Sequence, residues 1–197
     1  GGLAVLCGDD RNAMSLAPPP CPWVTYGLSG PADYTVQDVR LNGMGSRAVV
    51  VERGTVLGEL ELAVPGVHNI LNALAAIAVG RHIGIGFAEL AKALAGFHGA
   101  KRRFEVLGEE RGILVVDDYA HHPTEIRATL AAARQLGRRV VAVFQPHRYT
   151  RTRFLGDELA HSFADADCLV LTDIYAAAER PIPGVTIDRV FAATREA

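Results

Sequence analysis

Three polar segments of this 197-residue chain carry the side chains best suited to binding a charged ligand. They contain carboxylates, imidazoles, guanidinium groups and hydroxyls, and they span residues 117–123, 145–151 and 173–179. Each segment follows a short apolar run with the pattern of a buried strand. Ligands of open α/β sheets bind beyond the carboxyl ends of the strands, where such segments lie. The sequence therefore predicts a polar-ligand site built from these three loops.

The second segment places arginines at the expected start of a helix, namely Arg148, Arg151 and Arg153. A helix N-terminus already bears partial positive charge, so cations are disfavoured there unless something negative compensates. Guanidinium groups and free backbone N–H groups together form a receptor for a carboxylate or phosphate. Two other interpretations stay open from the residues alone: a solvated basic turn, or a salt bridge to Asp157 and Glu158.

The first segment holds two aspartates and two histidines within six residues, Asp117, Asp118, His121 and His122. Such a set could ligate a metal ion. Consecutive histidines do not easily point at one ion, however, and the following Pro123 restricts the turn further. We rank hydrogen bonding to a substrate first, a structural role for histidine second and a metal third. Asp117 by itself is also explained as a strand-end or capping residue.

Two asparagines three residues apart, Asn69 and Asn72, lie at the expected start of another helix. Asn69 is well placed as its N-cap. Asn72 is harder to explain, because asparagine is a poor helix former. Its carboxamide could recognise an adenine edge by donating and accepting hydrogen bonds at once.

The C-terminal half alternates between strand and helix patterns. Strands are expected at 113–117, 140–144 and 168–172, and helices at 123–135, around Leu155, Leu159 and Phe163, and from 186 onward. Pro123 at the first helical position and Glu125 in the first turn are typical of a helix start. This alternation predicts an α/β fold with a Rossmann-like, doubly wound parallel sheet.

The N-terminal half has a different organisation. An apolar run at 3–8 precedes Asp9 and Asp10, which could cap a brief helix before a proline-rich loop. Runs rich in β-branched residues predict antiparallel strands and hairpins at 34–41, 48–52 and 56–64. Helical spacing of apolar residues predicts a helix from residue 69 and a second at 87–97. Gly99 and the basic residues after it indicate a linker, so we expect domains at 1–100 and 101–197.

Bulk composition narrows the class of protein. The formal charge is only −2, which argues against a nucleic-acid partner. No apolar run is long enough to cross a membrane, and the first residues lack the pattern of a secretory signal. The three cysteines lack metal-ligand spacing, which predicts reduced thiols in a cytoplasmic protein.

Four segments resemble motifs of the Mur ligases. Residues 64–80 resemble the adenine-side motif of the family, and residues 103–105 resemble its domain-linker motif. Residues 117–125 and 144–152 resemble signatures of the branch that adds L-alanine, and the second of these separates that branch from the ligase that recycles murein tripeptide. The resemblance covers essentially the whole chain. Ala120 and Ala178 stand where glycine is expected, which restricts the backbone near the site.

The resemblance implies an ATP-dependent ligase that joins L-alanine to UDP-N-acetylmuramate through an acyl phosphate in peptidoglycan biosynthesis. Such chemistry needs charge neutralisation on the phosphates and correct placement of the nucleophile. The residues implied for ATP are His68, Asn69 and Asn72 at adenine, Arg103 near the ribose and phosphates, and Asp118 at the ribose hydroxyls. Those implied for the alanine and muramoyl pocket are Tyr119, His121, His147, Arg148 and Arg151.

The resemblance also implies that the chain is a fragment. Residues 1–100 would be the C-terminal part of the central ATP-binding domain, and 101–197 an incomplete C-terminal amino-acid-binding domain. The glycine-rich phosphate loop, the Mg²⁺ ligands and the domain that holds the UDP moiety are expected upstream, so no metal ligand or catalytic residue is assigned here. We expect residues 1–197 alone to be inactive. Two alternatives remain: another amino-acid or peptide ligase of the Mur superfamily, and a non-catalytic nucleotide- or precursor-binding module.

Overall fold

The structure is a computed structural model that describes residues 2–196. The chain divides between Gly99 and Ala100 into two compact units, unit 1 (residues 1–99) and unit 2 (residues 100–197). Each unit has its own hydrophobic core.

Unit 1 is a five-stranded mixed sheet with three helices, the longest at Val67–His82. Its elements are β1 (Ala4–Cys7), α1 (Arg11–Ser15), β2 (Trp23–Tyr26), β3 (Tyr34–Leu41), β4 (Ser46–Glu52), β5 (Thr55–Leu62), α2 (Val67–His82) and α3 (Phe87–Ala95). The strand order is β1-β2-β3-β4-β5, with parallel pairing from β1 to β3 and antiparallel pairing from β3 to β5. The expected hairpins are confirmed. Asp10 caps α1 by accepting from two backbone N–H groups, as predicted.

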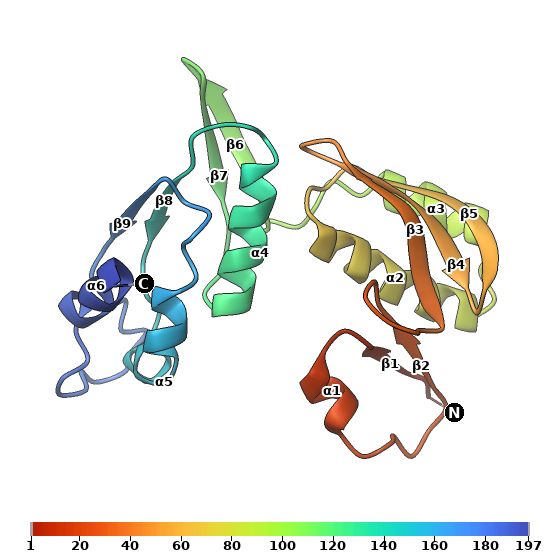
Figure 1. The fold of residues 1–197 in the computed structure, drawn as a ribbon, viewed down its shortest axis with the longest axis horizontal. Helices are drawn as coiled ribbons and strands as arrows, with labels where there is room; N and C mark the ends of the chain where they lie inside the picture. The colour runs from red at the N-terminus through yellow and green to blue at the C-terminus, as the bar shows by residue number, and fades with distance from the viewer. Residues whose placement is uncertain (1, 197) are drawn as a thin grey trace. The chain divides into compact units, whose positions relative to one another are not determined.

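The core of unit 1 lies between this sheet and α2. Ile70, Leu74 and Ile77 are almost fully buried, and they form the apolar stripe that the helical spacing predicted. They pack against strand residues such as Val50 and Leu60. Helices α2 and α3 cover one face of the sheet (Figure 1). The packing of this face holds the first turns of α2 in place.

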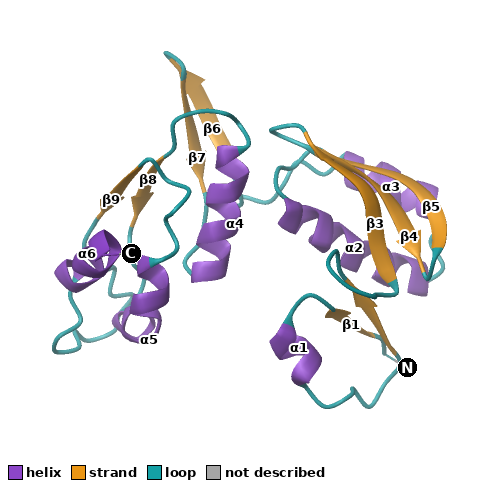
Figure 2. Ribbon diagram, in the orientation of Figure 1, coloured by secondary structure: helices purple, strands orange, loops and turns teal. Residues whose placement is uncertain are grey.

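Unit 2 contains the three expected helices and one unexpected hairpin. Its elements are β6 (Glu105–Glu110), β7 (Ile113–Asp117), α4 (Pro123–Arg134), β8 (Val141–Phe144), α5 (Tyr149–Ala160), β9 (Cys168–Leu171) and α6 (Ile187–Glu196). β8 and β9 pair in parallel, which confirms the α/β class. β7 pairs antiparallel with β6, a strand that the sequence reasoning missed (Figure 2). The core joins Ile126 and Leu130 of α4 to Phe144, Leu159 and Phe163.

The hairpin of β6 and β7 repeats a turn found in unit 1. Arg111 and Gly112 have φ of 52° and 78°, and Arg53 and Gly54, between β4 and β5, have φ of 46° and 82°. Positive φ at both central residues of a two-residue loop is the type I′ geometry, which matches the twist of paired strands. The Arg-Gly pair at 111–112 was therefore the local feature that could have predicted β6.

No helix within residues 2–196 combines the length and the apolar character needed to cross a membrane. Cys7, Cys21 and Cys168 are free thiols, and each is partly buried.

Candidate functional site

The residues expected to contact adenine lie in the first turns of α2, in unit 1. The helix begins at Val67 with Gly66 as its N-cap, so the prediction that Asn69 is the N-cap was wrong. Gly66 has φ of 90°, a left-handed conformation that glycine adopts easily, and this starts the helix earlier. Asn69 instead donates from Nδ2 to the carbonyl of Pro65 at 2.7 Å.

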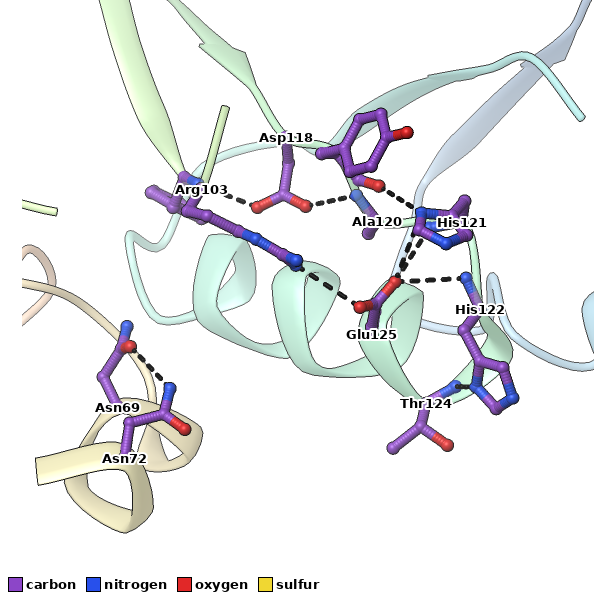
Figure 3. Close-up of polar contacts among 11 residues, drawn as sticks. Asn69, Asn72, Arg103, Asp118, Ala120, His121, His122, Thr124 and Glu125 are labelled. Carbon is purple, nitrogen blue, oxygen red and sulfur yellow. Dashed lines mark hydrogen bonds and ion pairs between the residues drawn. The ribbon is translucent and has the colours of Figure 1, made fainter. Parts of the chain in front are cut away.

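A second hydrogen bond orients Asn72. Its Nδ2 donates to Asn69 Oδ1 at 3.2 Å, and its own Oδ1 points away from Asn69 (Figure 3). Asn72 is exposed and His68 is half-buried. The pair of carboxamides is therefore held by the helix start, with the Asn72 amide at the surface of unit 1.

In unit 2, Asp118 ties the linker segment to the loop after β7. Its two carboxylate oxygens accept from the backbone N–H groups of Phe104, at 2.8 Å, and Ala120, at 2.7 Å (Figure 3). Tyr119 N donates to the carbonyl of Arg102 at 2.7 Å, and the Arg102 guanidinium lies over the Tyr119 ring. Each carboxylate oxygen keeps a second lone pair, so Asp118 can still accept from a ligand hydroxyl.

Glu125, in the first turn of α4, connects Arg103 to the two histidines. Its carboxylate accepts from the backbone N–H groups of His121 and His122, at 3.2 and 3.3 Å, and from Arg103 Nη1 at 3.4 Å (Figure 3). Burial opposes ionisation of this carboxyl. The hydrogen bond from His121 N–H, the nearby His121 ring, the His122 N–H and Arg103 outweigh burial and lower the pKa of Glu125.

The two histidines have different roles. His122 caps α4, since its Nδ1 accepts from Thr124 N at 3.3 Å and completes a capping box with Glu125. His121 Nδ1 lies 2.8 Å from the Tyr119 carbonyl. A carbonyl only accepts, so Nδ1 carries the proton and Nε2 is left as an acceptor in the neutral ring. Within residues 2–196, no three His, Cys, Asp or Glu side chains converge to hold a metal ion.

The loop after β8 carries His147 and Arg148, and Arg151 lies in the first turn of α5. The negative partner at this helix end is Glu179, from the loop after β9. Its carboxylate accepts from Thr150 N at 3.0 Å and from Thr150 Oγ1 at 2.7 Å. Arg148 Nη1 lies 4.0 Å from the same carboxylate. The negative charge expected beside the arginines is thus supplied by Glu179 of the same chain, and not by Asp157 or Glu158.

Glu179 was missed as a functional candidate, although it belongs to the third polar segment. The backbone N–H of Thr150 and then its hydroxyl lower the pKa of Glu179, with a further contribution from Arg148. The arginine-rich helix start called for an anion, and Glu179 was an acidic residue expected at the same sheet edge. The sequence therefore gave one indication of a role for Glu179, namely an acidic residue expected near an arginine-rich helix start.

His147 is held as a neutral imidazole. Burial lowers its pKa, and the charges of Arg151 and Arg148 lower it further. The ring packs against Tyr175 with the ring centroids 5.0 Å apart, and the buried Nδ1 has no hydrogen-bond partner in the protein.

Arg153 does not join the other two arginines. It lines a hollow of about 270 Å³ between α5 and α6, together with Asp157 and Arg189. Unit 2 therefore brings Arg103, Asp118, Tyr119 and His121 together around one loop and His147, Arg148 and Arg151 around the next.

Comparisons with known proteins relate both units to one family. The model described as "Mur ligase middle domain" matches residues 1–80, and "Mur ligase, glutamate ligase domain" matches residues 102–196. UDP-N-acetylmuramate–L-alanine ligase of Pelotomaculum thermopropionicum is 53% identical over 195 residues, which is 98% of this chain and 42% of that protein. The protein of the same name from Gloeobacter violaceus is 57% identical over 182 residues, covering 91% of this chain and 38% of that protein. The chain thus spans about two fifths of the length of these relatives.

A solved structure agrees with these matches. The UDP-N-acetylmuramate-alanine ligase of Thermotoga maritima is 32% identical, with a TM-score of 0.72, over 88% of this chain and 37% of that one. These findings confirm the resemblance to the Mur ligases. The two domain matches together take in most of unit 1 and nearly all of unit 2, and the chain belongs to the Mur ligase family.

Proposed function

We propose that the complete protein containing this chain is an ATP-dependent ligase that joins L-alanine to UDP-N-acetylmuramate through an acyl phosphate. The observation that carries this proposal is the high identity to relatives of that name along nearly the whole chain. We assign residues 1–100 to the C-terminal part of the central ATP-binding domain and 101–197 to an incomplete amino-acid-binding domain. We place the enzyme in the cytoplasm, in keeping with three free thiols.

For ATP, we assign His68, Asn69 and Asn72 to adenine, Arg103 to the region of the ribose and phosphates, and Asp118 to the ribose hydroxyls. The Asn72 carboxamide can donate and accept at once, as an adenine edge requires. Asp118 retains free lone pairs after its two backbone hydrogen bonds. Mg²⁺ would neutralise phosphate charge in this reaction. The described residues of this chain offer no cluster for it, so we assign no Mg²⁺ ligand among residues 2–196.

For the amino acid, we assign Tyr119, His121, His147, Arg148 and Arg151. Two guanidinium groups suit the carboxylate of L-alanine, because each can form paired, charge-assisted hydrogen bonds. The low pKa of His147 keeps that ring uncharged at neutral pH. A neutral imidazole beside two arginines avoids repelling the ammonium form of the amino acid, and it can accept a hydrogen bond from the amine.

The test is phosphate release from ATP by the complete protein, with UDP-N-acetylmuramate and a panel of amino acids. We expect release that depends on both substrates and is strongest with L-alanine. Preference for any amino acid other than L-alanine, glycine or L-serine would point to another ligase of the superfamily. Binding of nucleotide without turnover would point to a non-catalytic module.

A substitution tests the assignment of the arginines. Arg148→Ala or Arg151→Ala should raise the KM for L-alanine by about 10- to 100-fold, the cost of losing charge-assisted hydrogen bonds. The melting temperature should change little, because the Arg148 side chain is 51% exposed. Arg153→Ala, on the same helix but facing the hollow, is the matched control and should leave KM unchanged. A large fall in melting temperature with normal KM would mean that the arginines are structural.

A further inference from the structure

The loop after β9 places a carboxylate on the first turn of α5. Glu179 Oε2 accepts from Thr150 N and Oε1 accepts from Thr150 Oγ1. The Glu179 side chain is only 22% exposed, although its partner Arg148 is half exposed. Backbone N–H groups at the start of a helix otherwise lack partners and attract anions. Here an acidic group of the chain itself takes that position.

The backbone of Arg148, directly before α5, is held in a strained conformation. Its φ is 77°, in the left-handed region that side chains other than glycine disfavour. Its N–H donates to the carbonyl of Tyr175 at 2.8 Å, and its carbonyl accepts from Thr152 N at 3.1 Å and Thr152 Oγ1 at 2.8 Å. Such a conformation persists only where the surroundings determine it.

The turn that delivers Glu179 is strained as well. Ala177 and Ala178 have φ of 46° and 67°. The turn is closed by the Glu179 N–H, which donates to the carbonyl of Ala176 at 2.9 Å. Both sides of the contact between the two loops therefore store backbone strain. Strain of this kind gathers at functional sites, where it serves to fix geometry.

The Glu179 contact leaves the arginine side chains available. Arg148 Nη1 stands 4.0 Å from the carboxylate, too far for a hydrogen bond. The helix N–H at Thr150 is occupied, so it cannot serve a substrate carboxylate at the same time. The guanidinium groups remain available to an incoming carboxylate, and the position of the Arg148 guanidinium depends on the backbone conformation of Arg148.

We propose that Glu179 is a positioning residue of the amino-acid site. It joins the loop after β9 to the start of α5 and so holds Arg148 in the conformation that receives the substrate carboxylate. This role rests on the proposed function, because it takes Arg148 as a ligand of L-alanine.

The experiment is a double-mutant cycle in the complete protein, with KM for L-alanine and KM for ATP as separate readouts. Glu179→Ala should raise the KM for L-alanine by about tenfold, comparable to losing one charge-assisted hydrogen bond, and leave the KM for ATP within about twofold. Glu179→Gln keeps an acceptor oxygen for Thr150, so it should cause a smaller rise. It is also the variant to use if Glu179→Ala does not fold. Glu158→Ala, which removes an exposed carboxylate from α5, is the matched control.

The cycle separates positioning from a merely structural role. If Glu179 acts through Arg148, the effect of Glu179→Ala on the KM for L-alanine should disappear in the Arg148→Ala background. Fully additive effects, or a normal KM for L-alanine in the single variant, would overturn the inference. A wild-type protein that releases no phosphate with L-alanine would refute the proposed function, and the inference with it. An active wild type with unaffected Glu179 variants would refute the inference alone.

Discussion

Two alanines occupy positions where glycine is expected from the family resemblance, and the structure treats them differently. Ala178 has φ of 67°, so a glycine there would relieve a steric cost. Ala120 does not adopt a positive φ, and its N–H is satisfied by Asp118. Alanine in place of glycine at position 120 therefore causes no backbone strain, whereas alanine at position 178 causes strain beside Glu179.

Replacing Ala178 by glycine should stabilise the protein. Release of left-handed strain outweighs the added entropy of the unfolded chain, so we expect a gain of about 0.5–1 kcal/mol in the free energy of unfolding. Urea denaturation of the complete protein measures this gain. Ala176→Gly is the control, because Ala176 has no positive φ and the change should destabilise by about 0.5–1 kcal/mol. Equal effects of the two changes would argue against strain at Ala178.

At the scale of elements, α4 depends on a complete capping box. His122 and Glu125 exchange hydrogen bonds across the first turn, and Pro123 occupies the first helical position without needing a donor. Glu125 also contacts Arg103. The start of α4 therefore fixes both the loop that carries His121 and the side chain of Arg103.

The capping role of Glu125 makes a prediction about pH. The pKa of Glu125 is lowered in the folded state, so its ionised form stabilises the fold at pH values above the ordinary glutamate pKa of 4.5. This contribution is lost as the pH falls through the lowered pKa of the folded state. Glu125→Gln should thus destabilise the protein at pH 6–7, and the difference from wild type should shrink below about pH 4. Urea denaturation at a series of pH values measures it, and a difference that does not depend on pH would contradict the prediction.

The helical and hairpin elements were largely predictable from local patterns. Apolar spacing predicted α2 and α5, and β-branched runs predicted β3, β4 and β5, because these patterns report one buried face of each element. Pro123 and Glu125, which are typical of a helix start, predicted α4. β6 was missed because most of its residues are exposed, so burial left no alternation to detect. The start of α2 was misplaced because Gly66, with φ of 90°, replaces the expected asparagine cap.

At the scale of the whole molecule, each unit has a separate core. Leu74 is fully buried in the core of unit 1, and Leu159 is 1% exposed in the core of unit 2. Units with their own cores can lose stability locally, and hydrogen exchange resolves such local openings.

Shortening a buried side chain in one core should therefore lower the stability of mainly that unit. Leu74→Ala should cost about 2–5 kcal/mol, through lost burial and a residual cavity. Hydrogen exchange should show reduced protection in α2 and in β3 to β5, with α4 and α5 much less affected. Leu159→Ala is the reciprocal control and should give the opposite pattern. Equal loss of protection in both units after either change would show that they unfold as one.

The sequence by itself determined the α/β class, most helices and strands, and the three polar loops, because spacing, turn residues and caps act over a few residues. It also indicated that the arginine-rich start of α5 needs a negative partner. Only the tertiary structure decided that this partner is Glu179, which lies 29 residues from Thr150 along the chain. Contact between such distant residues depends on parallel pairing of β8 with β9 and on the strained turn at Ala177 and Ala178. Local sequence patterns do not predict the contact between Glu179 and Thr150, because the packed sheet brings the two loops together.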